Sequence, residues 1–182
     1  VQMLIRNQLA QKNIELAQQI ETCKNNLYSY SAESNDESRT VVNVYYRKWF
    51  LLQEMQERAI SSHEQYDLLS REVSNIKLLE GFGQLMREIG KAMYLFSNSL
   101  LTDQPYTHPL SLEWTLSAVQ NMLEEERGEQ HYLTLSLLMK NLTGLERNLR
   151  EEETVSAQID VTVFNSRKPE RTRLADLLKT VH

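Results

Sequence analysis

The sequence predicts an all-α protein, an elongated helical bundle or coiled-coil-like rod of about four to five helices. Gly and Pro are scarce, with five and three in 182 residues, and every proline falls after residue 104. Apolar residues also recur three and four positions apart over long stretches, which is the period of a helix and not of a strand. A helix of about forty residues spans roughly 60 Å. We therefore expect one elongated domain over residues 1–182, cut from a longer protein because the chain begins with Val1.

The first half of the chain predicts two long helices. The first covers about residues 2–28, with an apolar stripe formed by Ile5, Leu9, Leu16, Ile20, Cys23 and Leu27. Residues 29–40 are rich in Ser, Asn, Asp and Glu, which predicts a loop. The second helix follows over about 41–79, where helical spacing overrides the strand propensity of its first residues.

Gly81 and Gly83 flank Phe82 and weaken a helix there, by about 1 kcal/mol each relative to Ala. No polar loop-like cluster separates the flanking apolar runs, so we expect a kink or short break in preference to a full reversal. A third helix over about 84–101 then ends at the segment bounded by Pro105 and Pro109, which is a firm break.

The longest predicted helix covers about residues 111–157. It contains a seam of leucines at spacings of three and four, typical of coiled coils: Leu135, Leu138, Leu142, Leu145 and Leu149. Gly128 and Gly144 fall inside this helix without interrupting its pattern. Residues 159–164 alternate at period two and could form a short strand or a helix, and a short basic amphipathic helix is expected over about 169–180.

An aromatic cluster at the start of the second helix is a candidate protein interface, together with the leucine seam. It comprises Tyr45, Tyr46, Trp49 and Phe50. Successive helical residues are turned by about 100°, so these four side chains cannot share one narrow stripe. They form either a second interface or one thick core.

The sequence predicts no catalytic residue, no cofactor site and no metal site. A di-iron bundle needs a Glu three positions before a His. Ile60, Pro105 and Gly128 stand there before His63, His108 and His131. We interpret His63 as a partly buried, hydrogen-bonded core residue. Residues 124–126 and 151–153 are glutamate triplets that we interpret as solvated faces, and the single Cys23 as a buried hydrophobe in a reducing compartment.

These features together predict a non-enzymatic, cytoplasmic coiled-coil scaffold or tether. It would mediate protein–protein interaction and oligomerisation through partner helices, as a homodimer or as a subunit of a hetero-complex. The net charge of −5 argues against nucleic-acid binding. No apolar run reaches the eighteen or more residues of a membrane span, so membrane contact is not favoured.

Two alternatives stay open. Residues 85–93, followed by a proline loop and Leu110-Ser111-Leu112, resemble the BAR-domain family. That resemblance implies a dimeric membrane-binding crescent, although the attraction of anionic lipids needs clustered Lys and Arg. The other alternative is a helical effector of bacterial or viral origin.

Overall fold

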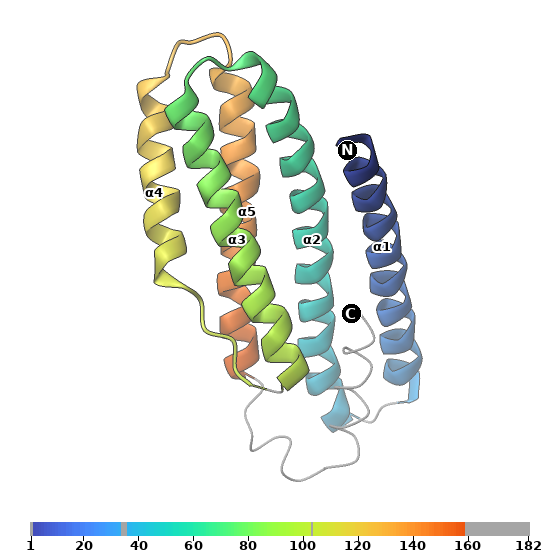
Figure 1. Cartoon of the computed structure of the whole chain (residues 1–182). Helices are drawn as coiled ribbons and strands as arrows, with labels where there is room; N and C mark the ends of the chain where they lie inside the picture. The colour runs from blue at the N-terminus through green and yellow to red at the C-terminus, as the bar shows by residue number, and fades with distance from the viewer. Residues whose placement is uncertain (1, 34–35, 103, 159–182) are drawn as a thin grey trace. The chain divides into compact units, whose positions relative to one another are not determined.

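The computed structural model describes residues 2–33, 36–102 and 104–158, and over these residues it confirms the all-α prediction. It contains helices α1 (Gln2–Glu33), α2 (Asp36–Glu72), α3 (Ile76–Thr102), α4 (Leu110–Glu125) and α5 (Tyr132–Gln158) and no strand in this part of the chain (Figure 1). The alternating run 159–164 and the predicted basic helix 169–180 lie outside the described residues.

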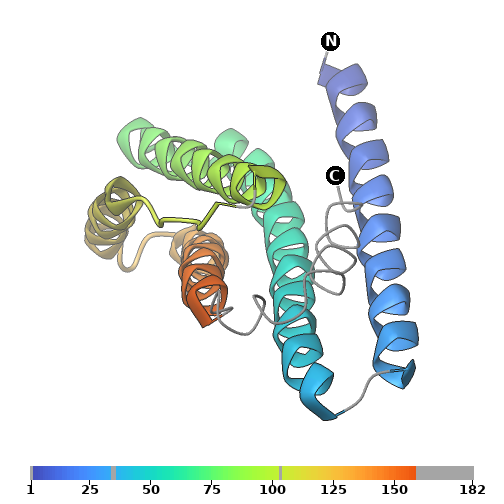
Figure 2. The same cartoon turned by 90° about the horizontal axis from the view of Figure 1, so that it is seen from below.

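The chain divides into two compact units. Of the described residues, unit 1 comprises 2–33, 36–56 and 154–158, and unit 2 comprises those within Glu57–Glu153. Unit 2 is an up-down-up-down bundle, in which the second part of α2, then α3, α4 and α5 alternate in direction (Figures 1 and 2). Short connections between consecutive helices produce this antiparallel arrangement.

The expected kink at Gly81 and Gly83 is wrong. Helix α3 runs through both glycines, and the chain reverses direction earlier, at residues 73–75. Asn75 caps the new helix, because its side-chain oxygen accepts a hydrogen bond of 3.1 Å from the backbone N–H of Leu78. Gly81 serves packing instead: a Cβ there would lie 2.6 Å from Met122 Cε of α4. The glycine therefore leaves room on α3 for the tip of the Met122 side chain of α4.

The prediction of one helix over 111–157 is also wrong. Helix α4 ends at Glu125 and α5 begins at Tyr132. Gly128 lies between them with a φ of 101°, in the left-handed region that favours glycine. The leucine periodicity continues on the far side of this turn, which is why the sequence pattern concealed it.

The predicted loop over residues 29–40 is mostly helical. Helix α1 extends to Glu33 and α2 begins at Asp36. Serine is compatible with the end of α1 because its hydroxyl can bond within the helix. Ser29 Oγ, for example, donates to the carbonyl oxygen of Asn25 at 3.1 Å.

The leucine seam of α5 forms the centre of unit 2. All five side chains, Leu135, Leu138, Leu142, Leu145 and Leu149, are between 0 and 2% exposed. They share the core with buried residues of α3 and α4 that include Phe82, Leu85, Ile89, Leu112 and Val119. In the folded chain these leucines are thus covered by their own bundle and do not form part of its surface.

Unit 1 packs α1 against the first part of α2. Its core is formed by Ile20, Cys23, Leu27 and Tyr45, with Tyr46 and Trp49 partly buried against it. The indole N–H of Trp49 donates to the carbonyl oxygen of Ile20 at 2.8 Å. Phe50, by contrast, is 57% exposed. The aromatic cluster is therefore divided, with three members packed on α1 and Phe50 directed outward.

The Leu142→Asp substitution should destabilise unit 2 by several kcal/mol, because it buries an unpaired carboxylate in the seam. Chemical denaturation followed by circular dichroism measures the effect. Leu137 lies on the same helix but is 48% exposed, so Leu137→Asp is the matched control and should change stability little. Equal effects of the two variants would contradict the assignment of the seam to the core.

The Trp49→Ala substitution should cost about 2 kcal/mol or more, because it removes the hydrogen bond to Ile20 and packing against α1. Phe50→Ala should change the melting temperature little, since the side chain is already mostly in water. Thermal melting of both variants checks this. A Phe50→Ala protein that unfolds readily would contradict the division of the aromatic cluster.

Candidate functional site

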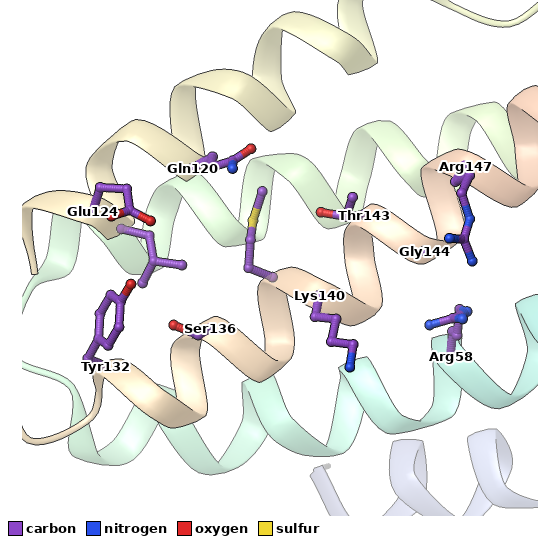
Figure 3. Close-up of a pocket in the computed structure, with 11 residues that line it drawn as sticks. Arg58, Gln120, Glu124, Tyr132, Ser136, Lys140, Thr143, Gly144 and Arg147 are labelled. Carbon is purple, nitrogen blue, oxygen red and sulfur yellow. The ribbon is translucent and has the colours of Figure 1, made fainter. Parts of the chain in front are cut away.

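A cavity of about 410 Å³ lies in unit 2 between the second part of α2, α4 and α5 (Figure 3). Its volume falls within the range of sites for small organic molecules. The lining combines charged, polar and apolar side chains from the three helices: Arg58, Gln120, Leu123, Glu124, Tyr132, Ser136, Met139, Lys140, Thr143, Gly144 and Arg147.

Three cationic side chains line the cavity. Arg58 comes from α2, and Lys140 and Arg147 come from α5. Figure 3 shows Arg58 and Arg147 at one end and Glu124 at the other. Glu124 is the one acidic residue of the described lining, and it forms an ion pair of 2.7 Å with Arg127 of the turn that follows α4. The Arg58 end therefore carries a positive charge that suits an anionic group.

Gly144 leaves space for the guanidinium of Arg58. A Cβ at this position would lie 2.5 Å from Arg58 Nη1 and 2.6 Å from Arg58 Cζ. A Cβ would fit only if the Arg58 side chain moved, so in this structure the guanidinium lies directly against the backbone of α5. The glycine in the leucine-rich helix thus positions a cation that belongs to another helix.

The rest of the lining contains the paired Glu124 together with neutral polar and apolar side chains. Leu123 and Met139 are buried members of the lining. Tyr132 supplies a phenol at the end where Glu124 lies (Figure 3). The hydroxyl oxygen of Ser136 is buried and has no hydrogen-bond partner among the described residues. The cavity as a whole is therefore suited to a small molecule with an anionic head and a less polar body.

A second polar cluster, only part of it buried, is formed by the loop before α4, the first turn of α4 and the adjoining face of α5. His108 Nε2 lies 3.2 Å from Glu146 Oε1, and His108 Nδ1 lies 3.2 Å from the hydroxyl of Tyr106. Arg150 forms ion pairs with Glu113, at 2.7 Å, and with Glu146. Burial, and then the neighbouring carboxylates, raise the pKa of Tyr106, so its phenol stays protonated. Single ligand atoms of His108, Glu113 and Glu146 lie within 4.8 Å of one another, a spacing that could hold a metal ion.

Two interpretations of titratable residues need correction. His63 is exposed and does not lie in the core. The triplet 151–153 is not uniformly solvated, because Glu152 is 0% exposed while its two neighbours are partly exposed. Both errors have the same cause, since a helical period identifies a face but not the neighbour that covers it.

Sequence reasoning identified neither the cavity nor the His108 cluster as a site. Arg58 and Arg147 are far apart in the chain, and neither belongs to a motif. The di-iron signature requires a Glu and a His on one helix, whereas His108, Glu113 and Glu146 come from a loop and two helices. Gly144 within a leucine seam was the one available signal of a close approach.

The Gly144→Ala substitution tests the contact between the Arg58 guanidinium and the backbone at Gly144. Alanine in a helix gains up to about 1 kcal/mol over glycine, and Gly90→Ala should show this gain because no atom lies within 4 Å of the added Cβ. Gly144→Ala should gain less, because the guanidinium of Arg58 must move. Repeating it in an Arg58→Ala background should restore the full gain, as measured by denaturation in a double-mutant cycle. Additive effects would contradict the contact.

Comparisons with known proteins place the chain beside inner membrane proteins. The family model described as "FUSC-like inner membrane protein yccS" matches residues 2–159. The Inner membrane protein YccS of Escherichia coli (strain K12) is 32% identical over 114 residues, which cover 60% of this chain and 16% of that protein. The chain thus spans less than a fifth of the length of this relative. No solved structure matches the chain.

These matches overturn the predicted function and location. The matching family is one of inner membrane proteins. The predictions of a cytoplasmic coiled-coil scaffold, a BAR-like crescent or a helical effector are therefore wrong. None of the described helices is long and apolar enough to cross a bilayer. Because the family model covers most of the sequence, the chain belongs to the FUSC-like family of inner membrane proteins.

Proposed function

We propose that unit 2 is a ligand-binding helical domain of a FUSC-like inner membrane protein, and that its cavity binds a small organic anion. The observation that carries this proposal is the presence of Arg58, Lys140 and Arg147 around one cavity of about 410 Å³ that also has an apolar wall. Charge-assisted hydrogen bonds to the cations supply affinity for the head group. Leu123 and Met139 supply contacts for the body of the ligand.

The charges on the outer faces support a domain that is surrounded by water. Exposed ion pairs join Lys91 to Glu88 at 2.8 Å on α3 and Arg71 to Asp67 at 3.0 Å on α2. Each would be costly in hydrocarbon, because charged side chains strongly disfavour the bilayer interior. We therefore place unit 2, as part of this proposal, beside the membrane.

The proposed role is binding and not catalysis. A serine nucleophile needs a base within hydrogen-bond reach. Ser136, the buried hydroxyl in the cavity, has no hydrogen-bond partner among the described residues. The cations of the lining suit the capture of a carboxylate or phosphate that remains chemically unchanged.

The Phe50 side chain supports a further proposal, that the chain contacts a protein partner or a second copy of itself. It is a large aromatic group, 57% exposed, of the kind enriched in interface cores. Light scattering of the Phe50→Ala protein would detect a smaller assembly if a second copy covers this residue.

Titration calorimetry with hexanoate and hexanol tests the cavity, because the two probes share a carbon chain and differ in charge. Hexanoate should bind and hexanol should bind at least about tenfold more weakly. Inorganic phosphate serves as a probe of the cationic end alone. Arg147→Gln should weaken hexanoate binding by about tenfold or more, whereas Arg71→Gln, on the exposed face of α2, should leave it unchanged.

Two results would contradict the proposal. Equal binding of hexanoate and hexanol would show that the cations make no contribution. Equal binding by the Arg147→Gln and Arg71→Gln proteins would place the anion elsewhere on the surface.

A further inference from the structure

We propose that the cluster of His108, Glu113 and Glu146, in which His108 and Glu146 are buried and Glu113 is partly exposed, binds a divalent transition-metal ion. The ligands are Nε2 of His108 and one carboxylate oxygen from each glutamate. This site is separate from the cationic cavity. The proposal of metal binding therefore does not depend on whether the cavity binds an anion.

The three ligand atoms already lie close together. Each is within 4.8 Å of the other two. Ligand atoms about 2.0–2.2 Å from a tetrahedral ion lie roughly 3.4 Å from one another. Side-chain movements that shift these atoms by about an ångström would therefore bring them to metal-binding distances. Three protein ligands leave a fourth position for water, as in catalytic zinc sites. A mixed set of imidazole and carboxylate suits first-row ions such as Zn²⁺ or Co²⁺ better than Mg²⁺ or Ca²⁺, which prefer oxygen alone.

The histidine is held in a position suitable for a ligand. Its side chain is 4% exposed. Among the described residues Nε2 has no hydrogen-bond partner of good geometry, although it lies 3.2 Å from Glu146 Oε1. The other ring nitrogen contacts the Tyr106 hydroxyl at 3.2 Å, and the backbone N–H of His108 donates to Glu153 Oε1 at 3.3 Å. Metal-bound histidines commonly have such a second partner, which fixes the ring and its tautomer.

Arg150 plays the part of a competing cation. Its guanidinium joins Glu113 and Glu146, and its side chain is 50% exposed. It therefore holds the two carboxylates side by side while retaining a path to solvent. A metal ion entering the cluster takes over these carboxylate charges, and the guanidinium moves outward.

The role of Arg150 distinguishes a metal site from a purely structural ion-pair network. Removal of Arg150 from a structural network leaves the buried Glu146 and the partly exposed Glu113 without this cation, which only destabilises the fold. Removal of Arg150 from a metal site also removes a competitor for the carboxylates. The Arg150→Gln protein should then bind metal more tightly than the unchanged chain.

The experiment uses the full chain, freed of metal by a chelator and titrated with Co²⁺ and with Zn²⁺. Co²⁺ should produce the visible absorption of a four-coordinate site, and calorimetry should show one Zn²⁺ per chain. His108→Ala and Glu113→Gln should each weaken Zn²⁺ binding at least about tenfold, and Arg150→Gln should strengthen it. His63→Ala is the matched control, because His63 is exposed on α2 and should leave binding unchanged.

Circular dichroism of each variant keeps the test decisive. If His108→Ala unfolds the chain, the partly exposed Glu113 provides the milder substitution. The proposal is overturned if Co²⁺ gives no visible band, if His63→Ala weakens binding as much as Glu113→Gln does, or if Arg150→Gln abolishes binding in a folded protein.

Discussion

The burial of one leucine row on α5 is the constraint on which both candidate sites depend. Each fully buried leucine contributes about 1.5–3 kcal/mol, so rotating α5 about its axis would lose the contribution of the whole seam. Neighbouring residues of a helix point about 100° apart. With Leu145 and Leu149 fixed in the core, Glu146 contributes to the His108 cluster while Arg147 lines the cationic cavity. The rotation of α5 that buries its leucines therefore also determines where Glu146 and Arg147 lie.

Sequence periodicity was sufficient for the helical class and for the α5 core, because burial on one face of a helix repeats in the chain itself. It did not distinguish among the reasons for a glycine. Gly81 allows a close approach to Met122, Gly128 adopts a positive φ, and Gly144 makes room for Arg58. In the first and third cases the partner belongs to a distant segment. No pattern around the glycine carries information about that partner.

The candidate sites were hidden for the same reason. Arg58 and Arg147 meet only after α2 and α5 have packed, and His108 meets Glu146 only after the loop before α4 has folded onto α5. The error about location had a different origin. The predicted location was based on the lack of a long apolar run in this sequence. The chain matches only 16% of the length of its relative, so its own apolar content carries no information about the rest of that relative. Such a chain does not reveal where the whole relative resides.

The reactivity of the Cys23 thiol can report how often unit 1 opens. Cys23 is the single cysteine of the sequence, it is 1% exposed within unit 1, and burial raises the pKa of its thiol. Only the thiolate reacts readily with disulfide reagents. The rate of its modification in the native protein therefore reports how often unit 1 opens, while unit 2 contributes no thiol signal. Local opening of α1 from α2 can thus be timed in the intact chain without introducing a probe.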